Sequence, residues 1–288
     1  MSVKRRVVQA LDRPATRSLL ARLATARARR VLGRADVTIA YEGGWQHRVG
    51  GYGFPDGPRF EYHDAAIRRW TDEVAKHRRN AADYWFRHYA PAAGDIVVDV
   101  GAGRGEDVLA FSERVGPTGR VLAIEAHPAS FRLLKAFCRM NDLRNVTPIN
   151  CALMDAPGSV TIEDASDWRA NTVSGGSAPT AGTTVPATTL DVLCREQGVG
   201  EIAFLKMNIE GAERMALRGM PAALARTRHV CVCCHDFRAE RGDGDDYRTR
   251  AEVVETLTAA GFRVTGRRDD PRAYVRDHVH GSREAAML

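Results

Sequence analysis

Long apolar runs are missing from this sequence, and no stretch approaches the roughly 20 consecutive apolar residues that a membrane-spanning helix needs. The N-terminus also lacks the continuous apolar core of a secretory signal. No internal repeat and no collagen or coiled-coil period is present. Hydrophobic residues nevertheless make up 44% of the 288 residues, enough to build a substantial core. We therefore expect a large globular domain with an extension, and neither a disordered chain nor a fibre.

Cysteine is sparse, and its spacing does not favour a metal site. There are six cysteines and no C-x-x-C pair. Three of them crowd into 231–234, which is typical of a strand, where neighbouring residues face opposite ways. Cys233 and Cys234 are thus poorly placed to share a metal ion. We expect buried thiols in a reducing, cytoplasmic compartment rather than zinc ligands or disulfides. The six are Cys138, Cys151, Cys194, Cys231, Cys233 and Cys234.

Acidic residues are almost absent from the first 34 positions. Asp12 is the one acid there, against ten basic side chains, so this segment carries +9. The net charge is +6, and residues 35–288 together carry −3. The basic character belongs to an N-terminal arm, and a mildly acidic body disfavours extended nucleic-acid contact.

The arm itself reads as a helix with an apolar face that includes Leu20, Leu23 and Ala24. Three uses of this helix stay open: docking on the body, contact with a second subunit in a homo-oligomer, and peripheral attachment to an anionic membrane surface.

The rest of the chain predicts an α/β organisation. Residues 36–62 are rich in glycine and aromatics and favour short strands and loops, and 64–89 favour a helix. Strands and helices then alternate, which indicates an open, mostly parallel, doubly wound sheet. We expect a basic helical arm at 1–34, a helical or irregular cap at 35–92, the main domain at 93–278 and a tail at 279–288. The expected strands are 96–100, 121–125, 146–150, 160–163, 202–207, 230–234, 262–265 and 274–276; the expected helices are 105–115, 130–140, 189–195, 213–225 and 247–260.

A glycine-rich turn follows the first of these strands. The sequence Gly101-Ala102-Gly103-Arg104-Gly105 comes directly after an apolar run and before a helix, where glycines let the backbone approach a ligand closely. Glu106 stands where the dinucleotide fingerprint has its third glycine. Asp99 precedes the turn and could bind a ligand amine directly or through water, while Glu125 ends the next strand and suits two ribose hydroxyls. The ligand that these features predict carries an amine, a carboxylate and an adenosine but no pyrophosphate. S-adenosylmethionine has this combination of groups.

Several motifs resemble the class I methyltransferases, and more narrowly the FkbM family of S-adenosylmethionine-dependent O-methyltransferases. The resemblance covers roughly residues 94–265 and is most specific at 206–213. It departs from the family pattern at Asn208, where an aspartate is usual, and at Arg104 and Glu106, where uncharged residues are more common. The motifs are Val98-Asp99-Val100-Gly101-Ala102-Gly103-Arg104-Gly105, Ile124-Glu125-Ala126-His127-Pro128, Asn145-Val146 with Ala152-Leu153-Met154-Asp155, Thr189-Leu190-Asp191 and Lys206-Met207-Asn208-Ile209-Glu210-Gly211-Ala212-Glu213.

The resemblance implies a Rossmann-like sheet of seven strands and a cofactor site at the ends of its first strands. The expected cofactor-binding residues are Asp99, Gly101, Ala102, Gly103, Gly105, Glu125, Ala126, Cys151, Ala152 and Asn208.

The expected catalytic residues are Lys206, Glu210, His235 and Asp236, at the ends of two later strands. His235 has the unperturbed pKa of a base near neutrality, with Asp236 or Glu210 orienting it or taking the proton instead. A divalent ion on Glu210, His235 and Asp236 is the less favoured alternative, so no metal site is predicted. Segments 41–62 and 164–184 are candidates for a lid over the site.

The function expected from these features is methyl transfer from S-adenosylmethionine to a hydroxyl of a small molecule. A sugar or a polyketide-like natural product is the acceptor that the family resemblance implies. Two alternatives remain: a nicotinamide-dependent oxidoreductase, which Glu106 argues against, and a non-catalytic or RNA-binding module with a methyltransferase fold.

The cofactor assignment predicts that Asp99→Ala and Glu125→Ala each weaken the binding of S-adenosylmethionine, because each removes a carboxylate from the expected site. Titration calorimetry of both variants and the wild type measures this. Unchanged affinity in both variants would remove the site assignment.

Overall fold

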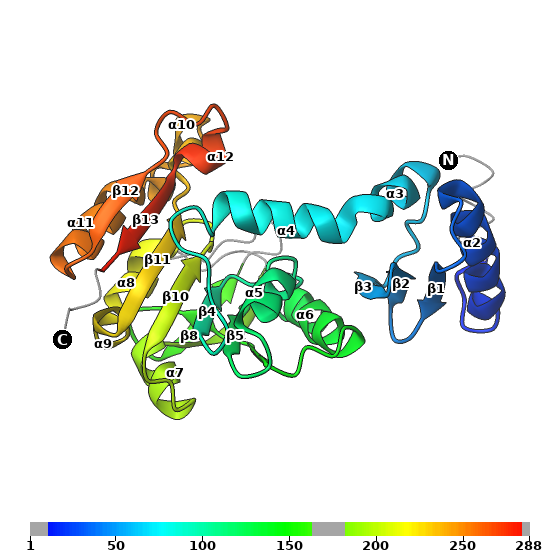
Figure 1. Ribbon diagram of the computed structural model, residues 1–288, viewed down its shortest axis with the longest axis horizontal. Helices are drawn as coiled ribbons and strands as arrows, with labels where there is room; N and C mark the ends of the chain where they lie inside the picture. Colours follow the sequence, from blue (N-terminus) through cyan, green and yellow to red (C-terminus); the bar gives the residue numbers. More distant parts are fainter. Residues whose placement is uncertain (1–10, 163–181, 284–288) are drawn as a thin grey trace. The chain divides into compact units, whose positions relative to one another are not determined.

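The computed structural model describes residues 11–162 and 182–283, and its main feature is a seven-stranded sheet (Figure 1). The strand order is β12-β13-β11-β10-β4-β5-β6. Pairs β4–β5, β5–β6, β4–β10 and β10–β11 are parallel, whereas β13 is antiparallel to both neighbours. The expected mostly parallel, seven-stranded α/β fold is thereby confirmed. The strands are β4 (Ile96–Val100), β5 (Arg120–Ile124), β6 (Val146–Ile149), β10 (Ile202–Met207), β11 (Thr227–Cys233), β12 (Arg263–Gly266) and β13 (His278–Ser282).

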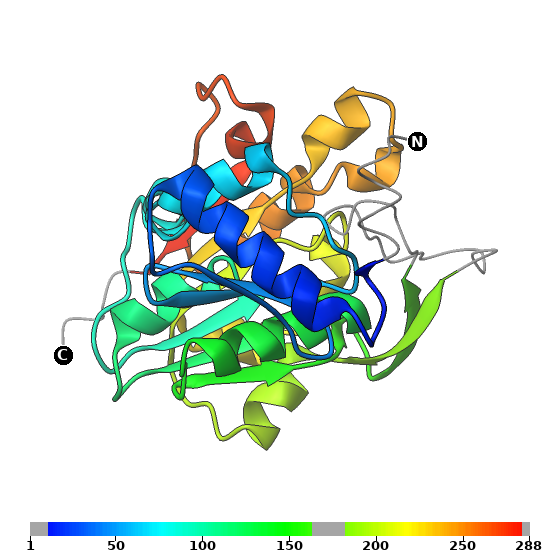
Figure 2. The same ribbon diagram turned by 90° about the vertical axis from the view of Figure 1, so that its right-hand side faces the viewer.

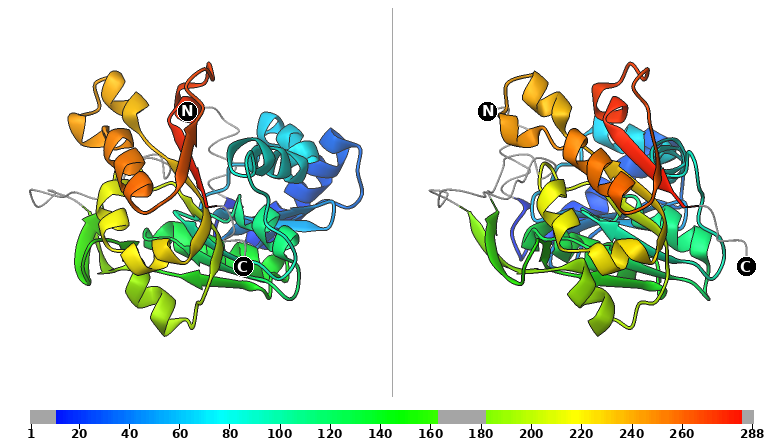
Figure 3. Two further views of the ribbon diagram at one scale, coloured as in Figure 1. Left: turned by 60° about the vertical axis from the view of Figure 1, so that its left-hand side comes forward. Right: turned by 90° about the vertical axis from the view of Figure 1, so that its left-hand side faces the viewer.

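The central strands are covered on both faces. All six residues of β10 are buried, as expected for a strand inside a parallel sheet. One face packs on helices α7, α8, α9 and α11 through a continuous apolar cluster that includes Val98, Leu205 and Val230. Figure 3 shows α11 beside strands β12 and β13. These helices are α7 (Leu190–Glu196), α8 (Glu213–Arg218), α9 (Pro221–Ala225) and α11 (Arg250–Ala259).

The opposite face of the sheet carries a mixture of aromatic and polar side chains. Phe204 of β10 packs against Phe86 and Phe111, with ring centroids 6.2 and 6.0 Å away. Phe111 belongs to α5 (Val108–Val115). Asp99 and Lys206 lie on this face too, because they are cross-strand partners one position along from the pair Val98 and Leu205. This face therefore combines an aromatic core with buried charge.

The segment between β6 and β10 forms a smaller sheet of three strands. Strands β7 (Ala152–Leu153), β8 (Gly158–Ile162) and β9 (Thr183–Thr188) form it in the order β7-β9-β8. Strand β9 begins at Thr183, inside the segment 164–184 that was expected to be a loop. Residues 164–181 of this segment, which was also a candidate for a lid, lie outside the described residues.

Residues 1–78 and 135–142 form one compact unit, and residues 79–134 and 143–288 form the other. In the first unit, helix α2 lies on the antiparallel sheet β1-β2-β3 (Figure 2). Its buried positions include Leu20 and Ala24, as expected, but Leu23 is 54% exposed. The elements are α2 (Arg17–Leu32), β1 (Thr38–Tyr41), β2 (Trp45–Val49), β3 (Tyr52–Gly57), α3 (Asp64–Arg69) and the 3-10 turn η1 (Trp70–Asp72); α4 (Glu73–Tyr84) and α6 (Pro128–Met140) span both units.

Several elements differ from the sequence prediction. The helix expected over 213–225 is broken at Gly219 and Met220, where Pro221 begins a second helix at a position that suits proline. Residues 274–276, expected to be a strand, belong to the short helix α12 (Ala273–Arg276).

The last strand, β13, lies at 278–282 and includes residues assigned to the tail. The sequence of β13, His-Val-His-Gly-Ser, is mostly polar although four of its five residues are buried, so its apolar pattern does not predict a buried strand. Helix α10 (Asp236–Glu240) and the 3-10 turn η3 (Asp245–Tyr247) were not predicted as elements of their own. No described helix combines the length and apolar character needed to cross a membrane.

The break at Gly219 gives a test of the packing. A Cβ atom there would lie 2.0 Å from the carbonyl oxygen of Met154, whereas a Cβ on Gly158 would meet nothing within 4 Å. We expect Gly219→Ala to lower the free energy of unfolding by about 1–3 kcal/mol, as overpacking does, and Gly158→Ala to change it little. Urea denaturation measures both, and equal stability of the two variants would contradict the packing described here.

Candidate active site

A pocket of about 250 Å³ lies at the carboxyl ends of β4, β5 and β10. Strand order reverses between β4 and β10, and such switch points are where open α/β sheets bind ligands. The pocket belongs to the second unit alone. Its lining residues are Val100, Gly101, Ala102, Gly103, Glu106, Asp107, Ile124, Glu125, Ala126, His127, Ser130, Cys151, Ala152, Leu153, Ile162, Lys206, Asn208, Ile209, Glu210 and Ala212.

Eight of the ten predicted cofactor-binding residues line this pocket, and two do not. Asp99 and Gly105 are not among its described lining residues. Of the four predicted catalytic residues, Lys206 and Glu210 line it, whereas His235 and Asp236 do not. The structure thus brings the glycine turn, the Glu125 segment and the end of β10 together.

Gly101 is required by a close approach of two strand ends. Its φ is +76°, a conformation that favours glycine. A Cβ atom at this position would lie 2.0 Å from the carbonyl oxygen of Asn208. The backbone N–H of Asn208 in turn donates to the carbonyl of Val100 at 3.0 Å. The glycine turn and the segment after β10 are therefore held in direct contact.

Glu125 points its carboxylate at the glycine turn. One oxygen accepts from the backbone N–H of Gly103 and the other from that of His127, both at 2.8 Å. Burial raises the pKa of Glu125, and these two hydrogen bonds oppose the rise. A carboxylate oxygen has further lone pairs beyond one hydrogen bond, so Glu125 can still accept from hydroxyl groups in the pocket.

Asp99 and Lys206 form a buried ion pair beneath the pocket. Lys206 Nζ lies 2.8 Å from an Asp99 oxygen and donates to the carbonyl of Gly101 at 2.8 Å. Burial raises the pKa of Asp99 to about 6, against the attraction of Lys206. Burial lowers the pKa of Lys206, but Asp99 and Asp107 together raise it above the usual value. The expected direct role of Asp99 in binding a ligand amine does not fit this position, because its side chain is 0% exposed and is not among the described residues that line the pocket.

Asn208 offers an acceptor to the pocket. Its side-chain oxygen is buried and has no hydrogen-bond partner among the described residues. A buried polar atom of this kind is costly without a partner, so a donor on a bound molecule would stabilise it.

Glu210 lines the pocket and has strained backbone geometry. Its φ is +53°, which is uncommon outside glycine and concentrates at functional sites. Its carboxylate lies 2.9 Å from Arg238 Nη1 and 3.3 Å from His235 Nε2. Two cationic side chains thus fix one carboxylate that lines the pocket.

His235 lies behind Glu210 rather than in the pocket. It is 2% exposed, and its Nδ1 is 2.8 Å from a carboxylate oxygen of the fully buried Glu213. Burial lowers the pKa of His235, but Glu213 and Glu210 outweigh burial and raise it to about 10. An imidazolium at neutral pH donates hydrogen bonds and does not accept a proton, so these surroundings do not suit the general base expected of His235.

Asp236 binds the backbone at the start of α11 and does not line the pocket. One of its carboxylate oxygens accepts from the backbone N–H groups of Thr249 and Arg250 at the start of α11. The set Glu210, His235 and Asp236 is not among the described groups whose ligand atoms could surround a metal ion.

Sequence reasoning missed two residues that shape the site. Glu213 and Arg238 hold His235 and Glu210 in place. Glu213 is part of the motif at 206–213, so its carboxylate could be noted from the sequence. Its pairing with the buried His235 could not be predicted. Arg238 follows His235 by three residues, a spacing that brings them together only because a helix begins at Asp236.

A family model of the methyltransferase FkbM domain matches residues 99–264. No curated protein matches the chain significantly. Among solved structures, methyltransferase FkbM from Methylobacillus flagellatus KT is 16% identical with a TM-score of 0.48; the match covers 76% of this chain and 53% of that one. Fibrillarin from Aeropyrum pernix, solved with natively bound S-adenosyl-L-methionine, is 15% identical with a TM-score of 0.40 (85% and 93% covered). A SAM-dependent methyltransferase from Aquifex aeolicus is 16% identical with a TM-score of 0.39 (72% and 96% covered). The chain therefore spans about half the length of the first of these proteins.

The raised pKa of His235 predicts a loss of stability in alkaline solution. The imidazolium gains its carboxylate partners on folding, so its contribution is complete below the unfolded pKa of about 6.5. That contribution is lost as the pH rises through the folded pKa of about 10. In His235→Asn the free energy of unfolding should fall less steeply between these pH values than in the wild type, by up to about 1.4 kcal/mol per pH unit.

Urea denaturation at a series of pH values measures both slopes. The comparison uses the slope and not the absolute stability, because the variant also leaves Glu213 without its buried partner. Parallel curves for the two proteins would show that His235 does not hold its proton as described.

Proposed function

The chain belongs to the FkbM methyltransferase family, and from this premise we propose that it transfers a methyl group from S-adenosylmethionine to a hydroxyl of a small molecule. The observation that carries the proposal is the meeting of the glycine turn, Glu125 and the end of β10 in one pocket at the switch point of the sheet.

The pocket suits the cofactor in its donor and acceptor groups. Glu125 would accept hydrogen bonds from the ribose hydroxyls, and the unpartnered oxygen of Asn208 would accept from the amine. Ala102, Ala126 and Ala152 line the same pocket with small apolar side chains that leave room for an adenosine. Bound S-adenosylmethionine supplies a methyl group already activated on a sulfonium.

The protein's own task is then to position the acceptor and remove its proton. We assign this task to Glu210, whose carboxylate lines the pocket while Arg238 and His235 fix its orientation. The acceptor hydroxyl would donate a hydrogen bond to Glu210 and give it the proton as the oxygen–methyl bond forms, while the sulfur–methyl bond breaks and S-adenosylhomocysteine is the leaving group. His235 and Arg238 are positioning residues in this account, and Lys206 keeps the glycine turn in place through the carbonyl of Gly101.

A small molecule is the acceptor class that the charge distribution favours. Residues 35–288 together carry −3, and this balance disfavours the extended phosphate contacts of a nucleic-acid substrate. A sugar or a polyketide-like hydroxyl compound follows from the family and from no individual residue of the pocket.

Glu210→Gln tests the assignment. It should lower kcat about 100-fold or more, the scale of a lost general base, while the affinity for S-adenosylmethionine changes little. The matched control is Glu252→Gln, which alters a carboxylate paired with Arg218 away from the pocket. The assay follows release of S-adenosylhomocysteine with a panel of free sugars and hydroxylated polyketides.

Equal kcat in Glu210→Gln and the control, on an acceptor that the wild type methylates, would remove Glu210 from the reaction. Binding of S-adenosylmethionine without transfer to any hydroxyl, but with transfer to an amine, would replace the O-methyltransferase assignment and keep the cofactor site.

A further inference from the structure

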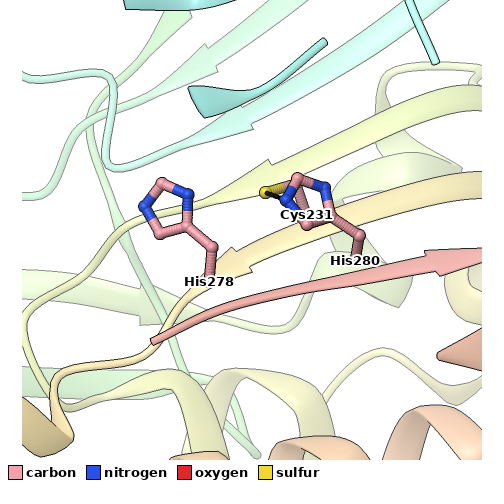
Figure 4. A group of neighbouring side chains, drawn as sticks. All are labelled: Cys231, His278 and His280. Atoms are coloured by element: carbon pink, nitrogen blue, oxygen red, sulfur yellow. Dashed lines mark hydrogen bonds between the residues drawn. The ribbon is translucent and has the colours of Figure 1, made fainter. Parts of the chain in front are cut away.

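A second group of chemically reactive side chains, on strands β11 and β13, is not part of the described pocket lining. Cys231 and His280 are directly opposed in the antiparallel pairing of these strands, and His278 lies two residues before His280 on β13. Side chains two residues apart on a strand face the same way, so all three lie on one face of the sheet. Figure 4 shows the two imidazole rings and the sulfur on that face.

The potential ligand atoms of these three side chains all lie within 4.8 Å of one another. Cys231 Sγ is 3.8 Å from His280 Nε2. Ligand atoms around a tetrahedral zinc ion lie about 3.3–3.7 Å apart, given the usual Zn–N and Zn–S lengths. Side-chain adjustments of about 1 Å would therefore bring the group to coordination distance.

The group is deeply buried, and part of its hydrogen-bonding capacity is unused. Cys231, His278 and His280 are 0%, 1% and 3% exposed. His278 Nδ1 has no hydrogen-bond partner among the described residues. The ring of His278 is instead stacked on Trp85, with centroids 5.0 Å apart and planes within 15°. An aromatic contact thus fixes the imidazole while one buried nitrogen lacks a partner, which is unusual for a buried polar atom.

We propose that Cys231, His278 and His280 bind a zinc-class transition-metal ion that links β13 to β11. A thiolate and two imidazoles are the donor set that zinc and copper prefer, and magnesium or calcium do not. The fourth position of a tetrahedral ion would be filled by water or by His88, whose ring centroid lies 4.8 Å from that of His280.

Binding of the ion requires neutral imidazoles and a deprotonated thiol. Burial raises the pKa of Cys231, whereas Lys206 and Arg267 oppose the rise. Metal binding would form the sulfur–metal bond and release the thiol proton to solvent.

The proposed ion has a structural role and not a catalytic one. None of the three side chains is among the described residues of the pocket. Strand β13 lies between β11 and the edge strand β12 in the sheet order, and a bond between β13 and β11 would fix this end of the sheet. Because the ion binds the folded form, it should stabilise the fold by an amount that grows with the logarithm of its free concentration above the Kd.

The experiment uses the full-length chain, stripped of metal with a chelator and titrated with Co²⁺ as the spectroscopic probe. We expect one ion per chain, with a thiolate-to-cobalt charge-transfer band and the intense visible bands of a tetrahedral ion. Zn²⁺ should then displace Co²⁺ and abolish these bands. In Cys231→Ala and His280→Ala the charge-transfer band and the tight binding should be lost.

The matched control is Cys194→Ala, which removes a buried thiol on helix α7, away from strands β11 and β13. It should bind one Co²⁺ with the wild-type spectrum. Circular dichroism compares each variant with the metal-free wild type, so that a variant that fails to fold is recognised.

The wild-type titration by itself keeps the proposal falsifiable. Absence of one-to-one binding, or weak binding without a charge-transfer band as surface histidines would give, overturns the site. Wild-type binding in Cys231→Ala overturns it equally. A rise in Tm with Zn²⁺ in the wild type and in Cys194→Ala, but not in Cys231→Ala, supports the structural role.

Discussion

The buried ion pair between Lys206 and Asp99 is the interaction on which the active site depends. The two residues are cross-strand partners on β10 and β4, and both are at most 1% exposed. Two charges taken out of water are stable together, while removal of one leaves the other uncompensated. Lys206 also binds the carbonyl of Gly101, so the pair ties the glycine turn to the strand on the other side of the switch point.

Buried charge also positions Glu210, the residue proposed to take the proton of the acceptor. Glu213 and Glu210 hold the pKa of His235 at about 10, and Arg238 adds a second cation beside Glu210. The carboxylate that reaches the pocket is thereby fixed by groups that lie outside it. The positive φ of Glu210 belongs to this arrangement, because a strained backbone persists only where its surroundings determine it.

Much of the fold could be predicted from the sequence because its signals are local. The apolar runs at 96–100 and 202–207 coincide with β4 and β10, and the helix expected over 189–195 is α7, which Thr189 caps. The glycine turn predicted the pocket for the same reason. Positions that depend on distant partners were less accessible: β13 is built from His278, Val279, His280, Gly281 and Ser282, whose burial comes from pairing with β11 and β12.

The site residues divide along the same line. Glu125 follows β5 directly and Glu210 lies three residues after the end of β10, so their place at the pocket could be predicted from order along the chain. Asp99 and His235 were assigned contact with ligands because carboxylate and imidazole suit such contact. Their buried partners, Lys206 and Glu213, give them other surroundings, and side-chain pairing across strands is not readable from one sequence.

The central claim is that the pocket at the switch point binds S-adenosylmethionine. Titration calorimetry of the wild type with S-adenosylmethionine, and separately with NAD⁺ and NADH, tests this claim most directly. The account predicts one-to-one binding of S-adenosylmethionine and no measurable binding of either nicotinamide cofactor. Binding of NAD⁺ or NADH without binding of S-adenosylmethionine would contradict it.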